Sequence, residues 1–221
     1  MATIAGVEVE IDPEAVVVTA TRPLAVLSSA VVGGGPGRAR AIVNLHVDKH
    51  CPWGDAVLRV DAFATRRALP APRVGLLTAA WTERAEVAAE SARGLTALVV
   101  ATVGLGNAVA AGWSPAAAPP PPPGTVNTIV VVDADVEPAA LVNLALTVTE
   151  VKTLVLVSSG LSCEDGAAAS GTSTDAVVIA ATGRGPTVRF GGPISDAGWL
   201  VARAARTALA AGVRRWMADR E

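Results

Sequence analysis

The chain has 221 residues, enough for one domain with a substantial core, and we expect a single domain spanning residues 1–221. Its formal net charge of −2, with scattered basic residues and 3% aromatic residues, provides neither a phosphate-tracking stripe nor a base-stacking platform, which excludes nucleic acid as the expected partner. Hydrophobic residues make up 51% of the chain but occur in short runs, so we expect a soluble protein without a membrane span.

Short runs rich in β-branched residues predict strands in the first part of the chain. These runs, which predict antiparallel strands at the start of the chain, are 8–11, 15–19, 24–29 and 41–47. A helix over 55–69 and a strand over 74–80 are expected next. Thr82, followed by glutamates, is expected to cap a further helix, and 95–103 predicts a buried strand.

A proline-rich segment, 114–124, cannot join a sheet or the interior of a helix and predicts a loop. Strands and long helices alternate after it, at 127–132, 138–156, 174–181 and 194–216. Ser195 or Asp196 is expected to cap the last helix. The pattern favours the α/β or α+β class, a single domain with a mixed β-sheet and helices packed on it.

Two glycine clusters follow predicted strands. They comprise Gly33, Gly34 and Gly35 in the first and Gly104 and Gly106, beside Asn107, in the second. Glycines at such positions either let a ligand approach the backbone or form plain turns. Neither cluster matches a phosphate loop or a dinucleotide-binding fingerprint.

His46, His50 and Cys51 lie close together in the sequence and are capable of metal ligation or thiol activation. The chain has only 2 histidines, too few for a closed metal site without distant carboxylates, so no metal is expected. Cys51 and Cys163 are far apart, and the acidic start lacks a basic segment leading into an apolar one. We therefore expect reduced thiols and a cytoplasmic location.

Polar residues border two of the predicted strands. Thr125, Asn127 and Thr128 begin the first of these strands and Asp133 ends it. The loop GTSTD, 171–175, places hydroxyls beside Asp175 before the second. Such groups either supply a nucleophile and its base or satisfy backbone donors in a turn, and the residues alone leave both alternatives open.

Together these segments resemble the adenosylcobinamide amidohydrolase family. The similarity is carried in order by LSSAVVGGG, IVNLHV, ATVGLGNA, GTVNTIVVVD with ALVNLALTVTEVKTLVL, GTSTDAVVIA and FGGPISDAGWLVARAARTAL, over about 22–215. The resemblance implies hydrolysis of the amide between aminopropanol and the corrin in adenosylcobinamide, giving adenosylcobyric acid for coenzyme B12 synthesis. It implies a corrinoid substrate and no separate cofactor.

Amide hydrolysis needs an activated nucleophile, donors for the oxyanion and a proton for the leaving amine. Given the resemblance, we assign Asp175 as general base or acid, and the predicted positioning groups are Thr172, Thr174, Asn127 and Thr128. Asn44, His46, Asp133 and Glu150 are expected to position substrate or to form an alternative acid and base. Trp53, Trp81 or Trp113 would border an apolar cleft.

Two alternative functions fit the same residues. A corrinoid-binding protein without catalysis would keep the glycine turns but need no acid or base. A different amidohydrolase would use Cys51 as nucleophile with His46 or His50 as its base. In each case the partner is a small molecule, and a homo-oligomer is compatible with the sequence.

Overall fold

The computed structural model describes residues 3–49, 53–116 and 125–219. Its main strands are β1 (Val7–Ile11), β2 (Ala15–Ser28), β3 (Gly35–His46), β4 (Arg73–Thr78), β5 (Glu86–Ala92), β6 (Leu95–Val103), β8 (Val126–Val132) and β11 (Ala176–Ala181). They form one mixed sheet in the order β4-β3-β2-β11-β8-β6-β5, with β1 paired to β2. The expected fold class, a mixed sheet with helices packed on it, is confirmed.

Helices and short strands complete the fold. The α-helices are α1 (Ala56–Arg66), α2 (Pro138–Ser158) and α3 (Asp196–Ala218), and single 3-10 turns are η1 (Trp53–Asp55) and η2 (Thr82–Arg84). The short strands are β7 (Ala108–Val109) paired with β10 (Gly171–Thr172), and β9 (Asp135–Val136) paired with β12 (Thr187–Val188).

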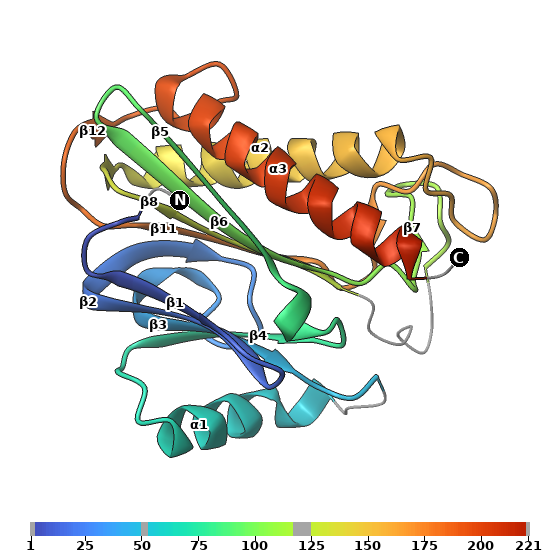
Figure 1. Ribbon diagram of the computed structural model, residues 1–221, viewed down its shortest axis with the longest axis horizontal. Coiled ribbons are helices and arrows are strands. Elements are labelled where there is room, and N and C mark those ends of the chain that lie inside the picture. The colour runs from blue at the N-terminus through green and yellow to red at the C-terminus, as the bar shows by residue number, and fades with distance from the viewer. Residues whose placement is uncertain (1–2, 50–52, 117–124, 220–221) are drawn as a thin grey trace.

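The main sheet folds over itself because β2 changes partners along its length. The first half of β2 pairs with β1 and β3, its second half pairs with β3 and β11, and the register shifts between Thr19 and Leu24. Bulges of this kind bend a strand and increase its twist. The result is four layers, with α2 and α3 on one side, two facing parts of the sheet, and α1 on the other side (Figure 1).

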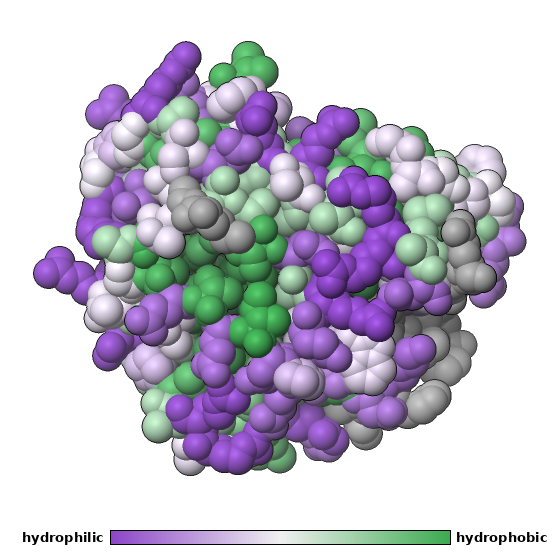
Figure 2. Space-filling view, viewed as in Figure 1, coloured by the Kyte–Doolittle hydropathy of each residue, from purple (hydrophilic) through white to green (hydrophobic). Residues whose placement is uncertain are grey.

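Apolar side chains fill the space between the two parts of the sheet. Buried residues of this central core include Val16, Ile42, Leu76, Ile129 and Val178, which come from β2, β3, β4, β8 and β11. At one edge the core is only partly covered, and Figure 2 shows hydrophobic side chains gathered between β5 and β1 on this face of the molecule. The core therefore holds together both layers that carry the polar groups described below.

The prediction of a helix after Thr82 is wrong. Thr82 begins only the single turn η2, and the chain then enters β5, which pairs antiparallel with β6. Arg93 and Gly94 both have positive φ at the turn between these strands, the geometry of a tight hairpin. Pairing with β6 thus overrides the helical preference of an Ala- and Glu-rich segment. The runs 15–19 and 24–29 also differ from expectation, since they form one continuous strand, β2.

The glycines of the FGGPISDAGW segment allow close contact between backbones. Ser195 is the N-cap of α3, as expected, and its hydroxyl accepts a hydrogen bond from the Gly198 amide at 3.1 Å. A Cβ at Gly198 would lie 1.9 Å from the carbonyl oxygen of Gly192. A side chain therefore cannot fit at Gly198 without moving the first turn of α3 away from the preceding loop.

Asp12 fastens the turn between β1 and β2 to two other elements. Its carboxylate accepts a hydrogen bond from Arg67 at 2.9 Å, and its carbonyl accepts one from the Thr82 hydroxyl at 2.7 Å. Burial raises the pKa of the Asp12 carboxyl, but hydrogen bonds from the amides of Ala15 and Glu14 and from Arg67 outweigh burial and leave this pKa below its ordinary value. The carboxylate is thus stabilised in its charged form.

Helix α2 is long and apolar enough, by length and composition, to cross a membrane. It packs instead along the sheet and against α3, and 39% of its most apolar window is buried inside the protein. Core helices of soluble proteins have the same length and composition, so this feature is weak evidence for a membrane span.

Candidate active site

Polar side chains lie buried between the two layers where β8 begins and where β3, β4 and β6 end. The Asn127 side-chain amide on β8 donates to Asn44 Oδ1 on β3 at 2.8 Å and to the Leu77 carbonyl on β4 at 2.9 Å. The Asn44 amide donates in turn to Thr102 Oγ1 on β6 at 2.9 Å. Asn44, Thr102 and Asn127 are each at most 2% exposed. The network therefore joins four strands, β3, β4, β6 and β8.

The orientation of both amides is fixed by one backbone group. A carbonyl oxygen only accepts hydrogen bonds, so the Asn127 atom that faces Leu77 is the amide nitrogen. Asn127 Oδ1 then points elsewhere, and it is buried without a hydrogen-bond partner among the residues that the structure describes. A buried acceptor in this state is costly unless a ligand or water supplies a donor, which makes Asn127 a candidate for contact with substrate.

His46 ends β3 two residues after Asn44 and therefore projects from the same face of the strand. Its Nδ1 lies 3.0 Å from the Ala80 carbonyl oxygen, and its ring stacks on Trp81 with centroids 4.9 Å apart. Because the carbonyl only accepts, Nδ1 carries the proton, and in the neutral ring the lone pair is on Nε2. His46 is partly exposed and Trp81 is 56% exposed, so both lie at the surface of the site.

Ala80 connects His46 to the second glycine cluster. A Cβ at Gly104 would lie 3.2 Å from the Ala80 Cβ and 3.5 Å from the Thr125 amide nitrogen. The Gly104 amide donates to the Thr125 carbonyl at 3.0 Å. Gly104 thus fits between the loop after β4 and the start of β8, and its lack of a side chain lets the two layers meet closely at this end of the molecule.

Asp175 and Lys152 form a second polar cluster on the α2 side of the sheet. The Asp175 carboxylate accepts hydrogen bonds from the Val126 amide at 2.9 Å, from the Thr172 amide at 3.0 Å, from the Thr172 hydroxyl and from Lys152 Nζ. The side chains of Lys152 and Asp175 are 12% and 10% exposed. Lys152 was not among the residues expected from the sequence, since one Lys in an apolar helix is usually a side chain that reaches solvent.

The hydrogen bonds of Asp175 favour a bracing role. A carboxylate has about four lone-pair positions, and four donors occupy them here. Asp175 therefore holds the first residue of β8, next to Asn127, and the strand β10. Thr174 joins the same region, because its hydroxyl lies 2.9 Å from that of Thr125. The proposed acid or base role of Asp175 stays a prediction.

We expect Gly171→Ala to destabilise the protein by about 1–3 kcal/mol, the usual cost of overpacking a core. A Cβ at Gly171 would lie 2.6 Å from Asp175 Oδ2 and 2.8 Å from Lys152 Nζ, so it would force the pair apart. Gly106→Ala is the matched control, because a Cβ there meets nothing within 4 Å. Urea denaturation of both variants checks the difference, and equal midpoints for the two would contradict it.

The remaining expected site residues lie elsewhere. Thr128 is buried and alternates with Asn127 along β8, so it faces α2 and α3. Gly33, Gly34 and Gly35 form the turn between β2 and β3, about 30 Å along β3 from Asn44. Their roles in substrate binding stay predictions.

Asp133, Glu150 and Asn107 occupy three different surroundings. Asp133 follows the far end of β8 from Asn127 and accepts hydrogen bonds from Thr182 and Arg184. Glu150 is exposed on α2. Asn107 donates to the Ser173 hydroxyl at 2.5 Å, which places it beside the loop that carries Asp175. Asn107 therefore lies beside the second polar cluster, Asp133 lies at the other end of β8, and Glu150 points to solvent two residues before Lys152 on α2.

His50 and Cys51 lie outside the described residues, and so does most of the proline-rich segment. Within residues 3–49, 53–116 and 125–219, no three His, Cys, Asp or Glu side chains gather in a way that would hold a metal ion. Trp113 is exposed after β7. The alternative mechanism with Cys51 as nucleophile stays a prediction.

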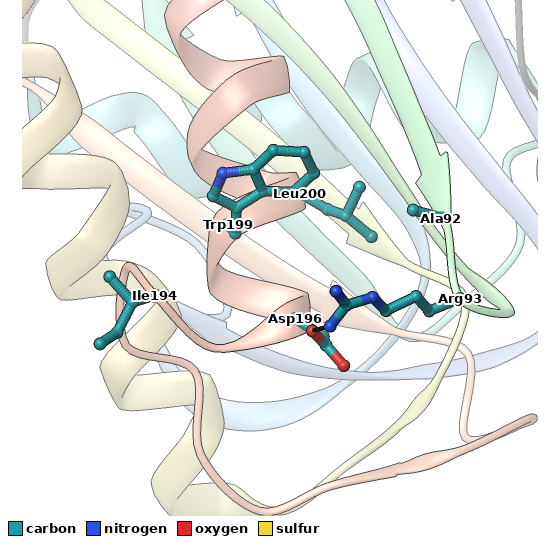
Figure 3. A pocket seen from close by; sticks show the side chains of 6 residues that line it. All are labelled: Ala92, Arg93, Ile194, Asp196, Trp199 and Leu200. Carbon is teal, nitrogen blue, oxygen red and sulfur yellow. Dashed lines mark hydrogen bonds and ion pairs between the residues drawn. The ribbon is translucent and has the colours of Figure 1, made fainter.

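A cleft of about 350 Å³ lies at the opposite end of the sheet (Figure 3). Its lining includes exposed Ile194 and Trp199, together with the exposed ion pair of Arg93 and Asp196. Arg93 precedes β6 whereas Thr102 is near its end, a separation of about 30 Å along the strand. This cleft is therefore separate from the Asn44, Thr102 and Asn127 network.

Comparisons with known proteins decide the family. The profile of the adenosylcobinamide amidohydrolase (CbiZ) family matches residues 1–221, the whole chain. The protein belongs to the adenosylcobinamide amidohydrolase family. It is accordingly a hydrolase that acts on an amide C–N bond, as the resemblance implied. No curated protein sequence matches the chain.

Two solved structures match this amidohydrolase family member over most of its length. The crystal structure of the PH0078 protein from Pyrococcus horikoshii OT3 has a TM-score of 0.51 and 11% identity, over 95% of this chain and 83% of that chain. A beta-aminopeptidase from Burkholderia sp. has a TM-score of 0.48 and 14% identity, over 94% of this chain and 79% of that chain. At these identities the first likeness concerns the fold alone, and we draw nothing from the second.

Proposed function

We propose that this protein hydrolyses the amide that links aminopropanol to the corrin of adenosylcobinamide, releasing adenosylcobyric acid for corrinoid salvage. The observation that carries the proposal is the family match over residues 1–221. The geometry supports it, because His46 lies on the same face of β3 as Asn44, whose Oδ1 accepts a hydrogen bond from the Asn127 amide on β8, and no hydrogen bond within the described residues occupies His46 Nε2. Amide hydrolysis requires a base and fixed polar groups in such an arrangement.

The size of the substrate fits a site at the surface of the sandwich. A corrin is too large to enter between the two parts of the sheet, where the core is packed by apolar side chains. Only the amide arm needs to reach the polar groups, while the flat ring stays outside. Trp81, exposed beside His46, offers an apolar surface for that ring.

The direct test is incubation of purified protein with adenosylcobinamide, with and without a chelator, followed by mass spectrometry. We expect adenosylcobyric acid and free aminopropanol in equal amounts in both samples. If the product forms only in the sample without the chelator, the reaction requires a metal ion. Tight binding of adenosylcobinamide without any product would contradict the proposed reaction. Thiol alkylation serves as a control, and loss of activity on alkylation would favour the mechanism based on Cys51.

A further inference from the structure

His46 is the only histidine within the described residues 3–49, 53–116 and 125–219. Its neighbours hold the imidazole in an orientation that suits proton transfer. The Ala80 carbonyl fixes the tautomer, and the stacked Trp81 ring restricts rotation of the imidazole. A general base is oriented in this way by a partner on its other nitrogen. No equivalent freedom exists at Asp175, whose oxygens are engaged by four donors.

We propose that His46 is the general base and then the general acid of the amide hydrolysis, acting through Nε2, and that Asp175 and Lys152 form a structural brace. This inference rests on the proposed function. It assigns the roles differently from the sequence, which favoured Asp175 as general base or acid and placed His46 among the groups expected to position substrate or to form an alternative acid and base. His46 qualifies because it is partly exposed and because no hydrogen bond within the described part of the chain occupies its Nε2 lone pair.

The proton balance follows from this assignment. His46 Nε2 takes a proton from water while the water oxygen adds to the amide carbon, and the carbonyl π electrons move to its oxygen. When this tetrahedral species collapses, the C–N bond breaks and its electron pair leaves with nitrogen. That nitrogen receives the proton from Nε2. One water is consumed, one carboxylic acid and one amine are formed, and His46 returns to the neutral state.

The test compares His46→Ala with the wild-type protein at saturating adenosylcobinamide. We expect kcat to fall about 10²- to 10⁴-fold, the usual contribution of a general base, while KM stays within about threefold. Added imidazole should restore at least about tenfold of the lost rate by occupying the space beside Trp81. His50→Gln is the comparison variant, because it removes the other histidine of the chain. A His46→Ala enzyme with unchanged kcat, or a loss confined to KM, would overturn the proposal.

A second measurement does not depend on the substrate. In the wild-type protein labelled with ¹⁵N-histidine, the His46 ring should show a protonated Nδ1 and an unprotonated Nε2, with the signal assigned by its absence from His46→Gln. The opposite tautomer would overturn the proposal even if hydrolysis occurs. If the expected tautomer is seen but the wild-type protein forms no adenosylcobyric acid, the proposed substrate fails while the prepared base stands.

Discussion

Asp175→Asn is expected to lower the free energy of unfolding by about 3–5 kcal/mol, as is typical when one partner of a buried ion pair is removed. The Lys152 ammonium would stay in a site where its side chain is 12% exposed, without the carboxylate that neutralises it. An amide also presents one acceptor oxygen in place of two, so the amides of Val126 and Thr172 cannot both keep their bonds. Urea denaturation followed by circular dichroism measures the loss.

Lys152→Met provides the control for this prediction. The double variant Asp175→Asn/Lys152→Met should lose less stability than the sum of the single variants, because it removes the charge that Asp175→Asn leaves unpaired. If Asp175 only braces the start of β8, folded Asp175→Asn protein should retain measurable hydrolysis. Unchanged stability with complete loss of kcat would instead return Asp175 to the role of acid or base that the sequence favoured.

Most strands could be predicted from the sequence because β-branched residues gather where the chain pairs. The strand β8 is an example, since its run from Val126 to Val132 is buried along its whole length. The strand β5 was missed because Ala and Glu favour a helix locally, and only pairing with β6 makes the segment extended. Local preference therefore fails where the partner of a segment supplies the stabilisation.

The candidate site was predictable in its residue types more than in its arrangement. Asn44 and Asn127 were noticeable as amides within apolar strands, but their contact joins positions 83 residues apart. Nothing in the local pattern shows that Asn127 faces β3 while its neighbour Thr128 faces the helices. The role of His46 depends likewise on the Ala80 carbonyl, a backbone group that no side-chain motif encodes.

Asn127→Leu is expected to destabilise the protein by about 2–4 kcal/mol and to abolish hydrolysis of adenosylcobinamide, although Leu has a similar volume and suits a buried strand. Leu supplies no donor, so Asn44 Oδ1 and the Leu77 carbonyl lose the bonds they accept from Asn127. Each buried acceptor left without a donor costs about 1–3 kcal/mol. Removing Asn127 Oδ1, which accepts no hydrogen bond from any described residue, offsets part of this cost.

Thr128→Val separates this effect from a general disturbance of β8. Thr128 is the next residue and equally buried, but it faces α2 and α3, and Val matches its shape. We expect a change within about 1 kcal/mol for this control in the same urea denaturation. Equal losses for the two variants would mean that β8 tolerates no substitution at all. A larger loss of stability for Asn127→Leu would show that the amides between the layers hold the two parts of the sheet together at the end where His46 lies. The network that orients the site would then also stabilise the fold.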